Sequence, residues 1–196
     1  MGLDMYLYRL SKPRPPVDTL NKMTYDTLTD KGYMVFVDGE EFPANFEAIK
    51  PYAKRVNIEA RYINFEQIKK DFDIPDDAFI VGESYSNEEV GYTFHLPHDD
   101  SQHITIPYEE YEKKYIFPKR TDAWCIKAEH IAYWRKNYNL ENAIYDACDT
   151  SIENCGFYPL NSDMWDVICR HDPSVYERIK EYRDKTSGCV CYHEWY

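Results

Sequence analysis

The chain has 196 residues, of which 35 are acidic and 23 are basic, so its formal net charge is −12. A chain of this length fits one domain, or one domain with an insertion, and buries enough surface to fold without disulfide staples. Because neutralising phosphates requires a basic surface, the charge argues against direct nucleic-acid binding.

Apolar runs and cysteine use bear on the cellular compartment. No run approaches the roughly 20 apolar residues of a membrane span, so no membrane association is expected. The first ten residues lack the basic start and the long apolar stretch of an export signal. The six cysteines are therefore expected to be free thiols in a reducing cytoplasm.

The N-terminal third predicts strands followed by one helix. Alternation of apolar residues predicts a strand over residues 3–8, ended by prolines that cannot extend a ladder. Apolar runs predict two further strands over residues 33–37 and 55–62. Apolar residues then recur at helical spacing over residues 65–72, which predicts a helix.

The middle of the chain predicts a three-stranded meander. Three apolar or alternating segments between residues 78 and 107 are separated by turn residues at 86–88 and 97–100. A short acidic helix is expected next, over residues 108–115. This segment is therefore an antiparallel sheet followed by a helix.

From Asp122 onward the pattern changes to helical spacing. Ile131, Trp134 and Tyr138 share one face of a predicted helix. Three more helices and a closing strand follow, expected over residues 140–148, 162–170, 173–182 and 189–195.

These elements predict an α+β protein, with a small antiparallel sheet, a C-terminal helical set and a β-meander insertion. Strands at both ends of the chain enclose the helical set, which favours a single domain over residues 1–196. Residues 33–118 are then an insertion subdomain within that domain.

Four segments carry a resemblance to a known family. They are Gly2–Tyr6 (GLDMY), Ile131–Lys136 (IAYWRK), Glu153–Tyr158 (ENCGFY) and Tyr192–Tyr196 (YHEWY). Together they resemble a family of uncharacterised proteins of tailed phages and prophages, over the first ten residues and residues 122–196. The resemblance implies a phage or prophage setting, hence a host-cell cytoplasm, and implies no catalytic activity.

The least random feature is a segment without basic residues. Between Asp71 and Glu112 there are 12 acids and no Lys or Arg. Tyrosines among these acids offer the rigid contact area that interfaces favour. The candidate contact residues are Asp76, Asp77, Glu83, Tyr85, Glu88, Glu89, Tyr92, Asp99, Asp100, Tyr108, Glu109 and Glu110.

This segment favours a non-catalytic phage accessory protein that binds a host protein with a basic surface. Spread carboxylates imitate a phosphate backbone, so the leading hypothesis is an anti-defence, anti-CRISPR-like inhibitor of a nucleic-acid-handling factor. The alternative interpretation is a solvated acidic face that only keeps the protein soluble. The sequence leaves the oligomeric state open.

A second hypothesis is a small-ligand-binding protein or enzyme centred on the predicted helix around Tyr133. Glu129 and Tyr133 would lie one turn apart, and Arg135 would hold an anion. Asp4 and His193 would supply a base if the terminal strands end nearby. In the alternative interpretation, the charged residues form structural ion pairs.

Metal binding is the weakest of the hypotheses. His95, His98 and His103 surround a hairpin tip and are candidate ligands, although ordinary turn chemistry also explains such a cluster. Cys189 and Cys191, with Cys169 and His171 in reserve, form a second set, whose alternative role is that of small buried apolar residues. No phosphate-binding or nucleophile-elbow motif is present, and no cofactor is expected.

Overall fold

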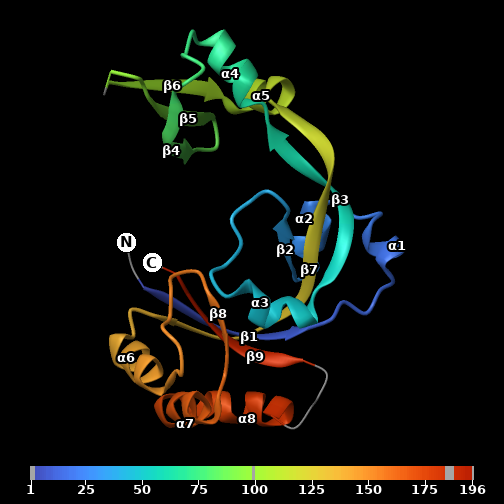
Figure 1. Ribbon diagram of the computed structural model, residues 1–196, viewed down its shortest axis with the longest axis vertical. Helices are drawn as coiled ribbons and strands as arrows, with labels where there is room; N and C mark the ends of the chain where they lie inside the picture. Colours follow the sequence, from blue (N-terminus) through green and yellow to red (C-terminus); the bar gives the residue numbers. More distant parts are fainter. Residues whose placement is uncertain (1–2, 99, 184–187, 196) are drawn as a thin grey trace. The chain divides into compact units, whose positions relative to one another are not determined.

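The computed structural model describes residues 3–98, 100–183 and 188–195, with the backbone alone described for residues 181–183. It is an α+β protein with antiparallel sheets (Figure 1). The chain divides into two compact units: unit 1, residues 1–59 and 121–196, and unit 2, residues 60–120. In the described part of the chain, no helix combines the length and the apolar character needed to cross a membrane.

Unit 1 is built on a six-stranded sheet in the order β2-β7-β1-β9-β8, with β3 also paired with β7. Strand β1 is antiparallel to β7 and β9, and the pairs β2–β7 and β8–β9 are antiparallel as well. The strands are β1 (Asp4–Ser11), β2 (Tyr33–Val37), β3 (Lys54–Ile63), β7 (Ile116–Arg135), β8 (Phe157–Pro159) and β9 (Cys189–Trp195).

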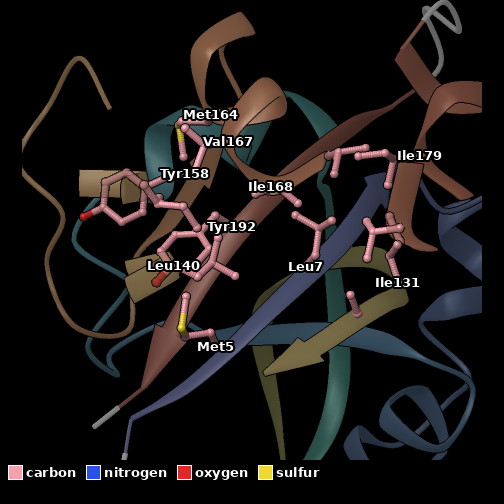
Figure 2. Close-up of a cluster of buried hydrophobic side chains, with 14 of the residues drawn as sticks. Met5, Leu7, Ile131, Leu140, Tyr158, Met164, Val167, Ile168, Ile179 and Tyr192 are labelled. Atoms are coloured by element: carbon pink, nitrogen blue, oxygen red, sulfur yellow. The ribbon is translucent and has the colours of Figure 1, made fainter. Parts of the chain in front are cut away.

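Three helices cover one face of this sheet: α6 (Tyr138–Ala147), α7 (Ser162–His171) and α8 (Pro173–Arg183) (Figure 1). Asn137 and Asn161 cap the first two by accepting hydrogen bonds from backbone N–H groups. Met5 and Leu7 of β1 pack against these helices together with Tyr192 of β9, and all three are fully buried (Figure 2). This face is called the helical face below.

The opposite face of the unit 1 sheet is rich in aromatic rings. Because side chains alternate along strands, Tyr6 and Tyr8 point away from the helical face, beside His193 and Tyr133 of the neighbouring strands. Toward its other end this face is covered by the short elements α3 (Phe46–Ile49) and η1 (Lys50–Tyr52). Two further short helices, α1 (Val17–Leu20) and α2 (Tyr25–Asp30), contribute Leu20 and Leu28 to a third buried cluster.

Unit 2 has a separate core. A three-stranded sheet in the order β4-β5-β6 packs with helices α4 (Phe65–Asp71) and α5 (Tyr108–Lys114). The strands are β4 (Phe79–Tyr85), β5 (Glu89–His95) and β6 (Ser101–Pro107). Tyr92, Phe94 and Ile106 are buried at its centre. The predicted meander and the two helices around it are confirmed.

The helix predicted around residues 129–136 is wrong, because this segment is the second half of the 20-residue strand β7. The reason lies in a bulge: Leu7 pairs with Ala132, but Tyr8 pairs with His130, so Ile131 is an extra residue. Ile131 and Ala132 are consequently both buried. This interruption of strict alternation resembles helical spacing in the sequence.

The predicted insertion and unit 2 nearly agree at the C-terminal boundary and differ widely at the N-terminal one. Unit 2 ends at Arg120, two residues after the predicted end of the insertion, but it begins at Ala60 rather than at residue 33. Strand β2 belongs to unit 1 because it pairs with β7, from Tyr33 opposite Lys127 to Val37 opposite Ala123.

Candidate functional sites

The predicted acidic contact surface lies in unit 2, around the edge strand β4. This strand pairs with β5 alone in the sheet order, and most of its residues are exposed. Phe79, Val81 and Tyr85 have 59%, 51% and 56% of their surface exposed. Val81 is an extra residue in the ladder, since Ile80 pairs with Phe94 and Gly82 with Thr93. The acidic, tyrosine-bearing pattern of the sequence indicated Tyr85 but gave no signal for the exposed Phe79 and Val81.

The acids gather at the two ends of this sheet. At one end, Glu88 and Glu89 lie in and beside the β4–β5 turn, and the Glu88 carbonyl accepts a hydrogen bond from the first residue of α5 at 2.7 Å. At the other end, Asp76 and Asp77 precede β4, and Asp100 precedes β6. A seven-residue strand separates the two groups by about 20 Å. Asp99 lies outside the described residues.

Bases from outside the acidic segment offset the charge at α5. Lys114 lies 2.7 Å from Asp71 and 3.9 Å from Glu110, and Lys113 lies 3.5 Å from Glu109. The Lys114 ammonium lowers the pKa of Asp71 to about 2, with the Tyr115 hydroxyl as the next contribution. The acids beside β4 differ, because within the described residues no ion pair involves Asp76, Asp77, Glu83, Glu88, Glu89 or Asp100.

Two of the predicted contact tyrosines are exposed and one is not. Tyr85 and Tyr108 have 56% and 38% of their surface exposed, whereas Tyr92 is fully buried. The Tyr92 hydroxyl donates to the Tyr111 hydroxyl at 2.9 Å, and burial raises the pKa of Tyr92 strongly. Tyr92 is therefore a core residue of unit 2 and cannot touch a partner.

Most of the residues predicted to form a small-ligand site lie together on the unit 1 sheet, on the face opposite the helical face. The Tyr133 hydroxyl donates to Asp4 Oδ1 at 2.6 Å, and this bond raises the pKa of Tyr133. Arg135 Nε lies 3.7 Å from the same oxygen, with 64% of the side chain exposed. The Asp4 carboxylate is thus engaged by both neighbours.

His193 lies on the same face but has a structural environment of its own. Its ring stacks on Phe157, with the centroids 4.3 Å apart and an interplanar angle of 9°. Its Nδ1 donates to the Gly156 carbonyl at 2.9 Å, and burial lowers its pKa. Glu129 points elsewhere, because its carboxylate pairs with Arg9 at 3.4 Å. The expected juxtaposition of Glu129 with Tyr133 is therefore wrong.

The metal candidates do not converge. Among the described residues no group of three His, Cys, Asp or Glu is placed to hold a metal ion. His103 lies between Thr93 and Thr105, His95 contacts the Phe79 ring, and His98 is exposed in the turn. The Cys189 and Cys191 sulfurs are 3.3 Å apart, as two free thiols.

Cys169 and His171, the additional candidate ligands, lie on helix α7, which covers the helical face of the sheet. Cys191 packs in the cluster with Leu10 and Phe157, whereas Cys169 on α7 packs against the helical-face cluster. Cys169 and His171 therefore do not complete a four-ligand set with the pair on β9.

A cavity in unit 1 was not anticipated from the sequence. It has a volume of about 850 Å³, and its wall includes Arg9, Lys12, Arg14, Tyr33, Tyr52 and Lys127. These residues come from β1, the loop after it, β2, η1 and β7. No local motif links them, so the only signal in the sequence is the short basic group over residues 9–14.

Comparisons of the chain with protein-family models, with curated proteins and with solved structures found no match.

Proposed function

We propose that this protein is a non-catalytic accessory protein that binds a partner through the exposed edge strand β4 and its flanking acids. The partner surface that fits is an extended segment with both basic and apolar side chains. In the phage setting that the resemblance implies, the partner is a host protein, and an inhibitor of a nucleic-acid-handling defence factor fits this chemistry.

One observation carries the proposal: an unprotected strand exposes apolar side chains, and the described acids at its two ends form no ion pair within the described residues. Phe79, Val81 and Tyr85 are each more than half exposed; Phe79 lies opposite His95, whereas Tyr85 lies opposite the buried Val90 and so projects from the other face of the sheet. Large side chains on an edge strand are a ready site for another chain, and natural edges are usually blunted by charge, especially lysine. No lysine lies on β4, and its one charged residue is Glu83.

Charge complementarity favours a basic segment as the occupant. Acids lie at both ends of β4, with Asp76 and Asp77 before it and Glu88 and Glu89 after it. An extended partner strand of similar length would place its basic residues near both groups while its apolar residues cover Val81. A solvated acidic face would not require Phe79 and Val81 to be exposed beside it.

The test is direct binding measured by calorimetry at low and at higher salt. The probes are a synthetic extended peptide that alternates lysine with valine, its lysine-to-glutamate counterpart, and the partner recovered from host lysate. We expect the basic peptide and the partner to bind unit 2, more weakly at higher salt because screening acts on exposed charges.

Two variants separate the apolar and electrostatic parts. Reversal of four acids (D76K, D77K, E88K, E89K) should weaken binding at least tenfold, and V81S with F79S should weaken it to a similar degree. The matched control is E40K with E41K, which reverses two exposed acids of unit 1. Binding that survives both unit 2 variants would overturn the proposal.

A further inference from the structure

The cavity in unit 1 concentrates positive charge in an acidic protein. Four of its lining residues, Arg9, Lys12, Arg14 and Lys127, are basic, and among the described residues Glu129 is the only lining carboxylate. The chain as a whole carries a net charge of −12. Because a recessed wall focuses the field of its charges, this excess of cations attracts anions into the cavity.

Lys127 is held in place by a local backbone arrangement. Its Nζ donates to the Lys31 carbonyl at 2.5 Å and lies 5.0 Å from the centroid of the Tyr33 ring. The next residue, Gly32, has a φ of +73°, and a Cβ there would lie 2.9 Å from Lys127 Nζ. The glycine thus provides both the left-handed turn and the space for the ammonium group.

Lys12 and Arg14 present their charges without compensation. Both side chains are exposed on either side of the buried Pro13. Within the described residues neither forms an ion pair. The loop that carries them is anchored by Lys54, whose Nζ donates to the Pro15 carbonyl at 2.9 Å. These two cations are therefore available to a ligand and are held on a tethered segment.

Two phenol rings add flat apolar surface to the wall. Tyr33 and Tyr52 are both partly buried and line the cavity. Burial raises the pKa of each, so both are neutral at physiological pH and do not repel an anion. Aromatic side chains of this kind stack on planar rings, and each base stacked contributes on the order of 1–3 kcal/mol by alanine substitution.

We propose that this cavity binds a free nucleotide, with the phosphates against Lys12, Arg14 and Lys127 and the base against Tyr52. The volume, about 850 Å³, lies within the range of small-molecule sites. A free nucleotide fits better than a long nucleic acid, because unit 1 outside the cavity contains more acidic than basic residues. A polyanionic strand that left the cavity would meet those acids.

Isothermal titration calorimetry with defined probes tests the assignment. The probes are adenosine triphosphate, guanosine triphosphate, adenosine, inorganic tripolyphosphate and a single-stranded oligonucleotide. We expect at least one nucleotide to bind at least tenfold more tightly than adenosine or tripolyphosphate, since each of these lacks one half of the ligand. Equal binding of tripolyphosphate and the nucleotides, tighter binding of the oligonucleotide, or no binding at all would overturn the proposal.

Variants assign the binding to this cavity. K12E and R14E, at exposed positions, should each weaken nucleotide binding about tenfold or more. E129Q removes a lining carboxylate and should strengthen nucleotide binding several-fold. Y52L should weaken the nucleotide but leave tripolyphosphate unchanged, whereas Y52F should preserve both. The matched control is K22E, at an exposed lysine that does not line the cavity.

This site is independent of the partner surface of unit 2. Its residues lie in unit 1 alone, so the unit 2 variants D76K and V81S should leave nucleotide affinity unchanged. Nucleotide binding that survives both K12E and R14E would place the ligand elsewhere and refute the cavity assignment, whatever the outcome of the peptide experiments.

Discussion

The two units bury tyrosine hydroxyls in different ways. In unit 1, Tyr192 and Tyr145 donate to the two oxygens of Glu194 at 2.7 and 2.5 Å, and Glu194 is fully buried. In unit 2, Tyr92 donates to another phenol, Tyr111, at 2.9 Å. Unit 1 thus tolerates a buried carboxylic group because two donors surround it, while unit 2 keeps its core neutral.

The two units also differ in the charges that their surfaces display. Unit 2, with the neutral core, displays exposed acids around β4, whereas unit 1 gathers cations around one cavity. The net charge of −12 for the whole chain does not reveal this difference between the two surfaces. Unit 1 has 22 acidic and 16 basic residues and unit 2 has 13 and 7, so each carries a formal charge of −6. The local distribution of charge within each unit, rather than its total, therefore predicts which ligands each part attracts.

The largest expected effect comes from truncating a buried side chain in the core of each unit. Leu7 in unit 1 and Ile104 in unit 2 are buried in separate clusters. Leu7→Ala and Ile104→Ala should each lower the free energy of unfolding of their own unit by about 3 kcal/mol, from lost burial and the cavity left behind. Hydrogen exchange followed by mass spectrometry measures the protection of each unit.

The control for the core substitutions is Val17→Ala, at a residue with 38% of its surface exposed. It should change the free energy of unfolding by less than about 0.5 kcal/mol. If Leu7→Ala lowered protection equally in both units, the two cores would unfold as one, and the comparison between them would fail.

The next largest effect concerns the hydrogen bonds made by tyrosine hydroxyls in each unit. Glu194→Ala removes the carboxylate that accepts from Tyr145 and from the fully buried Tyr192, which should cost about 2 kcal/mol. Tyr111→Phe in unit 2 removes a neutral hydrogen bond and should cost about 1 kcal/mol. Urea denaturation measures both, and Trp195→Ala, at a neighbouring residue with 55% of its surface exposed, is the control. A larger loss for Tyr111→Phe would reverse the comparison.

The elements of unit 2 were predictable because their patterns are local. Alternation along β5 and β6 and the turns between them follow from neighbouring residues, and one face of that sheet is buried. Strand β7 was not predictable in the same way. It is central in the sheet, with Cys125 and Ile126 buried on opposite faces, and the bulge at Ile131 shifts its period.

The same distinction separates the two candidate sites. The acidic segment is contiguous in sequence, so its charge was visible without a structure, although its division into two groups depends on strand register. The cavity joins Arg14, Tyr52 and Lys127, which lie far apart in the chain. Only the pairing of β7 with β1 and β2 brings such residues to one wall, and no composition or spacing reveals it.

The smallest expected effect is a difference in the response of the two units to acid. Burial lowers the pKa of His193 in unit 1, so its contribution to stability is present above the unfolded value of about 6.5 and is lost as the pH falls. In unit 2, the pKa of Asp71 is lowered to about 2 from 3.8, so its contribution is lost only as the pH falls between these values. Acid should therefore weaken unit 1 first through these groups.

Glu194 acts with the opposite sign and has to be separated from His193. Burial raises the pKa of Glu194, so its contribution is present below the unfolded value of about 4.5 and is lost as the pH rises through the folded value. His193→Gln keeps Glu194 and keeps an N–H donor for the Gly156 carbonyl, so the difference between wild type and this variant isolates the imidazole. Urea denaturation from about pH 7.5 to about pH 5.5 should show the wild type losing stability relative to the variant. Asp71→Asn should show no such change until the pH falls below about 4, and a relative gain by the wild type on acidification would mean that His193 is better protonated in the fold than outside it.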